Sequence, residues 1–157
     1  KGASPSQVAL LHRRLERLAQ VYKMESGVDV TEVEGAGAAG GLAGGLLTVG
    51  AKLVSGFEFI ADEVGLDELI EGADLVITGE GFLDDESFDG KVVGGVAALC
   101  AELDVPCVAI VGEVIEPLPA FPKGFSVVSL TERFGADRSM EDPIDCAIEV
   151  ALEFVEH

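Results

Sequence analysis

The stretch that decides the fold is Ala73–Lys91, which reads A-D-L-V-I-T-G-E-G-F-L-D-D-E-S-F-D-G-K. It begins with a short apolar run, Leu75–Thr78, whose β-branched residues predict a buried strand. We expect this strand to end at Gly79 and Gly81, because glycine permits backbone conformations that other residues resist. An acidic loop follows, and Gly90-Lys91 then opens a helical pattern. Ligands of open α/β sheets bind beyond the carboxyl ends of the strands, so this loop is the candidate site.

Further apolar segments extend this arrangement along the chain. Val105–Val111 and Phe125–Leu130 predict two more buried strands, while the polar stretch Thr131–Asp142 predicts a loop. Helical patterns follow the first strand and close the chain. The order predicts an α/β fold, with a three-layer, mostly parallel, Rossmann-like sheet that has helices on both faces. At this length we expect a single α/β domain over residues 1–157.

An N-terminal helical segment is expected before the sheet. Ser4-Pro5-Ser6-Gln7 has the composition of a helix start, with a capping serine, a proline at the first helical position and a glutamine three residues after the serine. Apolar residues then recur at helical spacing up to Tyr22. The next segment, Val28–Val33, predicts a short strand.

The chain is strongly acidic, with 10 basic and 29 acidic residues and a net charge of −19. Such a surface repels nucleic acids and anionic membranes, so neither is an expected partner, and a nucleotide would need a divalent cation. The three cysteines lack metal-ligand spacing and are expected to be buried, reduced thiols of a cytoplasmic protein. We see no signal peptide, and the uncharged run Gly35–Ala51 is too short and too rich in glycine to span a bilayer.

The glycine-rich tract Gly35–Leu47 leaves three interpretations open. Its first glycines fit the dinucleotide-binding pattern G-x-G-x-x-G, with Glu58 near the position of a ribose-binding acid. Glycines four residues apart would instead give a helix bare faces for close packing. A third interpretation is an anion site at a helix N-terminus. The residues that carry these patterns are Gly35, Gly37, Gly40, Gly41 and Gly45.

The acidic loop itself has features of a site for phosphate and a metal ion. Backbone N–H groups at Gly79 and Gly81 can converge on an anion, and Lys91 adds a cation at a helix N-terminus. Glu80 and Asp84 are the candidate ligands for Mg²⁺, which usually binds through one or two carboxylates together with substrate phosphates. Either carboxylate can also accept a proton from a substrate hydroxyl. The alternative is a solvated acidic loop with a capped helix behind it.

Two motifs together resemble the glycerate kinase family of the bacterial glycerate-pathway type. They are E-G-A-G-A-A-G-G-L at Glu34–Leu42 and A-D-L-V-I-T-G-E-G-x-L-D-x-x-S-x-x-G-K at Ala73–Lys91. The resemblance implies a C-terminal portion of a two-domain α/β enzyme that uses ATP and Mg²⁺ to phosphorylate D-glycerate to phosphoglycerate. It implies catalytic roles for Glu80, Asp84 and Lys91, with the metal at Glu80 and Asp84. The implied substrate- and phosphate-binding residues are Gly37, Gly40, Gly41, Thr78, Gly79, Gly81, Ser87 and Gly90.

Departures from the family pattern bear on activity. Phe82 stands where members usually have arginine, and Arg133 and Arg138 are the candidate cations to replace part of its role. The family's N-terminal loops carry part of the site, so the isolated chain is expected to need that missing N-terminal portion as a partner and to be inactive alone. The alternatives are a non-catalytic α/β binding or scaffold domain and an NAD-binding oxidoreductase domain. Homodimer formation also stays open.

Overall fold

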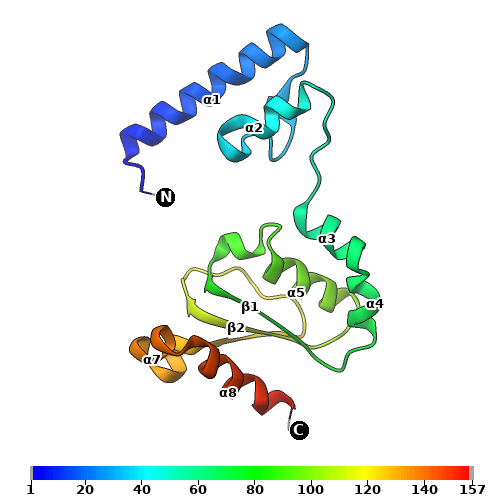
Figure 1. The fold of residues 1–157 in the computed structure, drawn as a ribbon, viewed down its shortest axis with the longest axis vertical. Helices are drawn as coiled ribbons and strands as arrows, with labels where there is room; N and C mark the ends of the chain where they lie inside the picture. The colour runs from blue at the N-terminus through cyan, green and yellow to red at the C-terminus, as the bar shows by residue number, and fades with distance from the viewer. Residues whose placement is uncertain (1, 156–157) are drawn as a thin grey trace. The chain divides into compact units, whose positions relative to one another are not determined.

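The computed structural model describes residues 2–155, and the chain groups into two compact units, Lys1–Val54 and Ser55–His157. Figure 1 shows the helices of both units and the sheet of the second. The first consists of helices, whereas the second contains the sheet. The expectation of one α/β domain over residues 1–157 stays a prediction. None of the helices in residues 2–155 has both the length and the apolar character needed to cross a membrane.

The first unit begins with the expected N-terminal helix, α1 (Pro5–Ser26). Ser4 and Gln7 form the predicted capping box: Ser4 Oγ accepts from the Gln7 backbone N–H at 3.4 Å, and Gln7 Oε1 accepts from the Ser4 N–H at 2.8 Å. Gly27 ends the helix in the left-handed conformation, and its N–H donates to the carbonyl of Lys23. The helix start predicted from the sequence is therefore confirmed.

The short strand predicted at Val28–Val33 is wrong. This segment contains a 3-10 helix, η1 (Val30–Glu32). The cause is Asp29, whose Oδ1 accepts hydrogen bonds from the backbone N–H and the hydroxyl of Thr31, at 3.2 and 2.6 Å. This local hydrogen bonding of an aspartate to the backbone two residues on favours a turn over an extended strand. The last helix of the unit is α2 (Ala38–Leu47).

The second unit contains a parallel sheet in the order β1-β2-β3. Its helices lie on both faces, and Figure 1 shows α5 and α8 on opposite sides of β1 and β2. The predicted α/β class with helices on both faces is thus confirmed. In chain order its elements are α3 (Gly56–Val64), α4 (Leu66–Glu71), β1 (Val76–Leu83), η2 (Asp85–Phe88), α5 (Val92–Glu102), β2 (Cys107–Val114), β3 (Phe125–Ser129), α6 (Leu130–Phe134), α7 (Ala136–Glu141) and α8 (Pro143–Val155).

Two hydrophobic clusters hold the layers together. The larger one lies between α5 and the sheet, and it includes Val93, Ala97 and Cys100 of α5 together with Cys107 and Ala109 of β2. The smaller one lies on the opposite face, where α6 and α8 pack under β2 and β3; its buried members are Leu130, Cys146 and Val150. All three cysteines are buried free thiols, as the sequence predicts.

Strand β1 does not end at the glycines, as the sequence analysis expects, but continues to Leu83. The glycines are needed for close pairing with β2. A Cβ atom at Gly79 would lie 2.2 Å from the carbonyl oxygen of Ile110, and one at Gly112 would lie 2.5 Å from the carbonyl oxygen of Gly81. Glycine in a strand often marks such a close backbone approach. The strand therefore ends two residues beyond the second of the two glycines.

The loop predicted at Thr131–Asp142 is also wrong, because this stretch contains α6 and α7. Ser129 starts the first of these helices by accepting a hydrogen bond on Oγ from the Glu132 N–H, at 3.3 Å. Phe134 packs against the smaller cluster and lies under the guanidinium of Arg138, 4.6 Å from the ring centre. Tertiary packing of this kind supplies the stability that such short helices lack alone.

Candidate functional site

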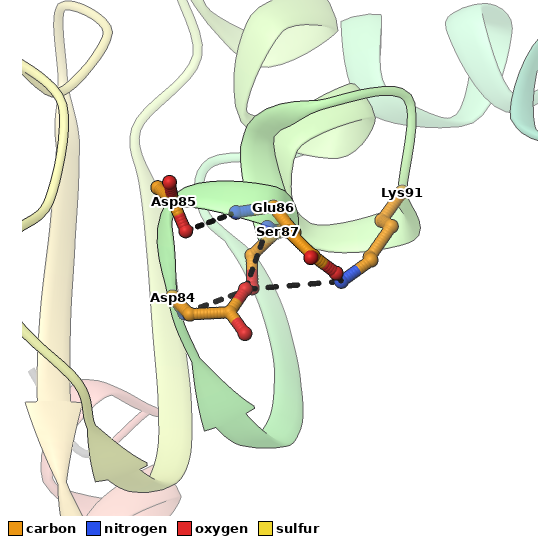
Figure 2. Close-up of polar contacts among 5 residues, drawn as sticks. All are labelled: Asp84, Asp85, Glu86, Ser87 and Lys91. Carbon is orange, nitrogen blue, oxygen red and sulfur yellow. Dashed lines mark hydrogen bonds and ion pairs between the residues drawn. The ribbon is translucent and has the colours of Figure 1, made fainter. Parts of the chain in front are cut away.

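The loop after β1 is held in shape by Asp84 and Ser87 (Figure 2). Asp84 Oδ1 accepts hydrogen bonds from the backbone N–H and the hydroxyl of Ser87, at 3.0 and 3.1 Å. Ser87 Oγ in turn accepts from the Asp84 N–H at 3.0 Å. The pair forms the capping box of η2, and Ser87 is fully buried. Its hydroxyl is therefore used to shape the loop that carries the candidate acids.

Lys91 closes this loop at the start of α5, where it is the N-cap residue. Its Nζ lies 3.7 Å from Asp84 Oδ1 and 3.4 Å from Glu86 Oε2, and Figure 2 shows the lysine side chain extended toward both. Both contacts are long and partly exposed, so they contribute little to stability. The ammonium, with three donors on a flexible stem, is thus held near the loop and can still contact an anion.

A cleft of about 710 Å³ lies beside this loop, within the second unit. Four of the predicted site residues line it: Gly79 and Glu80 from β1, and Gly90 and Lys91 before α5. The rest of its lining is mostly apolar and comes from α3, α5 and the start of α4, including Ile60, Val64, Leu66, Val92 and Val96. An apolar cleft with a few convergent polar groups has the general character of a small-molecule site.

Glu80 has an unusual environment in this cleft. Its Oε1 is buried and has no hydrogen-bond partner among the described residues. An unpaired buried acceptor costs about 1–3 kcal/mol, and more when charged. The oxygen is therefore suited to a donor or a cation that a ligand brings.

The remaining predicted residues of the second unit lie in β1 or in the loop that follows it. Thr78 and Gly81 both lie in β1, where Thr78 pairs with Ala109 of β2. Asp84 and Ser87 form the capping box described above. The second motif therefore builds one continuous structure from the strand through the loop to the start of α5.

The glycine-rich tract belongs to the first unit, and its glycines Gly41, Gly44 and Gly45 pack closely against α1. Ala39, Gly40 and Gly41 have positive φ angles of 52°, 68° and 91°, so α2 is kinked at this point. A Cβ atom at Gly41 would lie 2.8 Å from Leu18 Cδ2, and the Tyr22 hydroxyl donates to the Gly41 carbonyl at 3.3 Å. Of the three interpretations, these contacts support close packing. The prediction that Gly37, Gly40 and Gly41 meet the acidic loop stays a prediction.

The dinucleotide interpretation is wrong in its structural context. The fingerprint requires a strand directly before the first glycine, followed by a helix that begins at the glycines. Here η1 precedes Gly35, and the helix is kinked at Ala39 to Gly41. Glu58, the proposed ribose-binding acid, lies in the first turn of α3. The pattern is a coincidence of a tract rich in alanine and glycine.

Comparison with known proteins identifies the family. The model of the glycerate kinase family matches residues 1–146. The chain belongs to the glycerate kinase family. It is 41% identical to glycerate 2-kinase of Escherichia coli K12 over 117 residues, which are 74% of this chain and 31% of that protein. It is 39% identical to glycerate kinase of Halalkalibacterium halodurans over 115 residues, or 73% of this chain and 30% of that protein.

A solved structure agrees with this assignment. The fold matches a crystal structure assigned to glycerate kinase 2 of Salmonella typhimurium LT2, with a TM-score of 0.56 and 31% identity. The match covers 97% of this chain and 42% of that one. The chain thus spans about a third of the length of the curated glycerate kinases that it matches.

Two glycines of α5, Gly94 and Gly95, help to position the site, and the sequence analysis did not single them out. A Cβ atom at Gly94 would lie 2.6 Å from the Ser87 carbonyl oxygen, and one at Gly95 would lie 2.4 Å from the ring of Phe57. The first lets α5 approach the loop, and the second lets α3 approach α5. Their signal in the sequence is an adjacent glycine pair inside a helix, which is costly without a packing reason.

The cationic replacements considered for Phe82 are engaged elsewhere. Arg133 and Arg138 form ion pairs with Glu153 and Glu149 of α8. Helix α8 lies on the face of the sheet opposite α5, whose N-terminal end lines the cleft. Phe82 itself is exposed on β1. The structure therefore offers Lys91 as the cation at the cleft among the residues it describes.

Glu80 offers a magnesium ion a buried carboxylate oxygen in the cleft, whereas Asp84 Oδ1 is hydrogen-bonded to Ser87 and lies 3.7 Å from Lys91 Nζ. The described residues contain no group of three or more histidine, cysteine or acidic side chains that could hold a metal by themselves. Mg²⁺ seldom needs such a cage, because it keeps several waters and binds through one or two carboxylates plus phosphate oxygens. The partnerless Oε1 of Glu80 is the observation that favours it.

Proposed function

We propose that this chain supplies part of the active site of an enzyme that transfers a phosphoryl group from ATP to D-glycerate. It would correspond to the C-terminal portion of a glycerate kinase and act together with the remaining portion of such an enzyme. Membership of the family supports this reaction class. The cytoplasm is the compartment where both substrates and reduced thiols are expected.

The observation that carries the proposal is the cleft that brings Glu80 and Lys91 to one place. The two residues are separated along the chain by the whole acidic loop. A carboxylate with an unused acceptor and a cation with unused donors are the groups needed to bind a hydroxy acid and a phosphate. The apolar walls reduce the local dielectric, which strengthens both interactions.

Each residue has a role that follows from its environment. Lys91 would attract a phosphate or carboxylate oxygen, because it is the positive charge at the cleft. Glu80 would accept a hydrogen bond from a substrate hydroxyl and hold it for attack. Asp84, fixed by Ser87, would share a magnesium ion with Glu80 and the phosphates. The bound ion would neutralise phosphate charge, and phosphoryl transfer depends mainly on such positioning and charge stabilisation.

The experiment uses two matched lysine substitutions. Lys91→Met removes the cation at the cleft, whereas Lys123→Met removes an exposed lysine that pairs with Asp104. We would mix the chain with the separately expressed remaining portion of the Escherichia coli glycerate 2-kinase and measure ADP formation with D-glycerate, ATP and Mg²⁺. We expect Lys91→Met to lower kcat/KM by at least about tenfold, equivalent to about 1.4 kcal/mol, and Lys123→Met to change it less than about twofold.

The outcomes distinguish part of a kinase active site from a non-catalytic binding domain. Activity in the mixture that is unaffected by Lys91→Met would remove Lys91 from the site while leaving the kinase assignment. No activity in the mixture, together with no binding of ADP-Mg²⁺ or D-glycerate to the chain by calorimetry, would favour a non-catalytic binding domain.

A further inference from the structure

Helix α8 has an apolar face that nothing in the described residues covers. Cys146 and Val150 of this helix are buried under the sheet. A second row, offset around the helix, is 49–73% exposed. Its members are Ile144, Ile148, Leu152 and Val155. Their spacing of three or four residues places them on one face, which we name the α8 stripe.

Strand β1 is uncovered on the same side of the sheet. Ile77 of β1 pairs with Val108 of β2, so both side chains point to the same face. The neighbouring Ile110 of that face contacts the cluster formed by α6 and α8. Val108 is 1% exposed, whereas Ile77 is 40% exposed. The helical cover on this face therefore reaches β2 and stops short of β1.

The outer edge of β1 is also open. In the described part of the second unit β1 pairs with β2 alone, and it lies at the edge of the sheet order. Parallel sheets normally have both faces covered, and an unpaired strand edge is a template for another strand. An exposed helix stripe, an uncovered strand face and an open edge on one side of the unit are what a missing strand and helix would leave.

Resting on the proposed function, we propose that the α8 stripe, Ile77 and the open edge of β1 form the docking surface for the remaining portion of a family-length glycerate kinase. The occupant adds a strand beside β1 and a helix across Ile77 and the α8 stripe. The length comparison supports this occupant, because 97% of this chain aligns with only 42% of the Salmonella structure. Most of that longer polypeptide has no counterpart here, so it can supply the missing elements.

The charge of the chain disfavours a second copy as the occupant. Each copy carries a net charge of −19. Two copies that dock through α8 would also bring together the acidic residues beside the stripe, such as Asp145 and Glu149. Like charges of this size repel and keep proteins monomeric. A partner with an apolar centre and a less acidic rim suits the surface better.

The test places a charge on the surface and compares the chain alone with the assembled protein. Ile148→Lys lies on the stripe, and Met140→Lys on α7 is the control, at an apolar residue that is 75% exposed, against 51% for Ile148. We would measure the affinity of each variant for the remaining portion of Escherichia coli glycerate 2-kinase by calorimetry, and hydrogen exchange of β1 and α8 in the complex. We expect the first variant to weaken binding at least about tenfold and the control to leave it within about twofold.

A chimera provides a second measurement. In it, this chain replaces the matching segment of the Escherichia coli enzyme. Ile148→Lys should lower Tm of the chimera by roughly 4 °C or more and leave Tm of the isolated chain nearly unchanged, because the residue becomes buried in the chimera alone.

Three results would overturn the proposal. The first is binding to the remaining portion that Ile148→Lys does not weaken. The second is hydrogen exchange that slows on complex formation at segments other than β1 and α8. The third is a Tm shift caused by Ile148→Lys that is equal in the chimera and in the isolated chain. A concentration-dependent dimer of the wild-type chain that Ile148→Lys abolishes would make a second copy the occupant instead. All of these readouts are independent of phosphoryl transfer, so they leave the kinase proposal to its own test.

Discussion

Replacement of Gly79 by alanine should test the packing role of this glycine between β1 and β2. The residue lies in the middle of the β1–β2 pairing, opposite Ile110. Its added Cβ would be 2.2 Å from the Ile110 carbonyl oxygen, and contact at ordinary distances begins near 3.4 Å. The obstacle is the backbone of a buried strand, so relief requires β1 and β2 to move apart by more than about 1 Å.

The expected loss of stability follows from that displacement. Overpacking of this kind typically costs about 1–3 kcal/mol. Each ladder hydrogen bond that is stretched beyond use adds about 0.5–1.5 kcal/mol. We expect Gly79→Ala to lower the free energy of unfolding by about 3 kcal/mol or more, a large fraction of the typical 5–15 kcal/mol of a folded protein.

Gly81→Ala is the matched control. It lies in the same strand, has no positive φ, and its added Cβ meets nothing within 4 Å. We expect it to be neutral or to stabilise by about 0.4–1 kcal/mol, since alanine restricts the unfolded chain. Urea unfolding followed by circular dichroism, with hydrogen exchange of the β2 amides to report on the second unit, measures both. Equal stabilities for the two variants would refute the close approach of β1 to β2.

Three further predictions concern other residues. Ser87→Ala should lower the free energy of unfolding by about 1–3 kcal/mol, because the Asp84 N–H loses its partner. Urea unfolding measures the loss, and Ser87→Thr, which keeps a hydroxyl, is expected to lose less. The hydrogen bond from Lys23 holds the pKa of Asp29 at about 2, below the ordinary 3.8. Its stabilising contribution should therefore be complete above the unfolded value and vanish as pH falls through about 2. An NMR titration of the carboxyl measures the pKa, and urea unfolding of the wild type and Asp29→Asn at several pH values measures the contribution. Burial raises the pKa of Cys107 to about 12, and Cys100 and Cys146 are also buried, so a thiol reagent should modify all three only in unfolded protein.

The helix starts and the motif residues could be predicted because their causes are local. Ser4 caps α1 with the glutamine three residues later, and Lys91 stands directly before α5. The apolar runs of β2 and β3 likewise identified buried strands within a few residues of their observed bounds. Family membership followed from two motifs in one order, and the comparisons confirm it.

Two of the three errors arose where a residue's role depends on a distant neighbour, and the third has a local cause. Gly79 was expected to end a strand, but its lack of a side chain serves the backbone of β2, more than 30 positions away in the sequence. The loop expected after β3 became helical because Phe134 packs against a cluster that α8 completes. Asp29 turned an expected strand into η1 through a local side-chain bond that the apolar pattern did not reveal.

The sequence by itself determined the three buried strands, the helices α1, α5 and α8, the parallel arrangement and the residue types available for chemistry, since periodicity, capping and composition act over a few neighbours. Only the tertiary structure decided which of those residues share a cleft. Glu80 and Lys91 lie together because Gly94 and Gly95 let α5 approach both the loop and α3. That approach depends on the shapes of three packed elements, and packing is a property of surfaces that meet in space, which local sequence patterns do not encode.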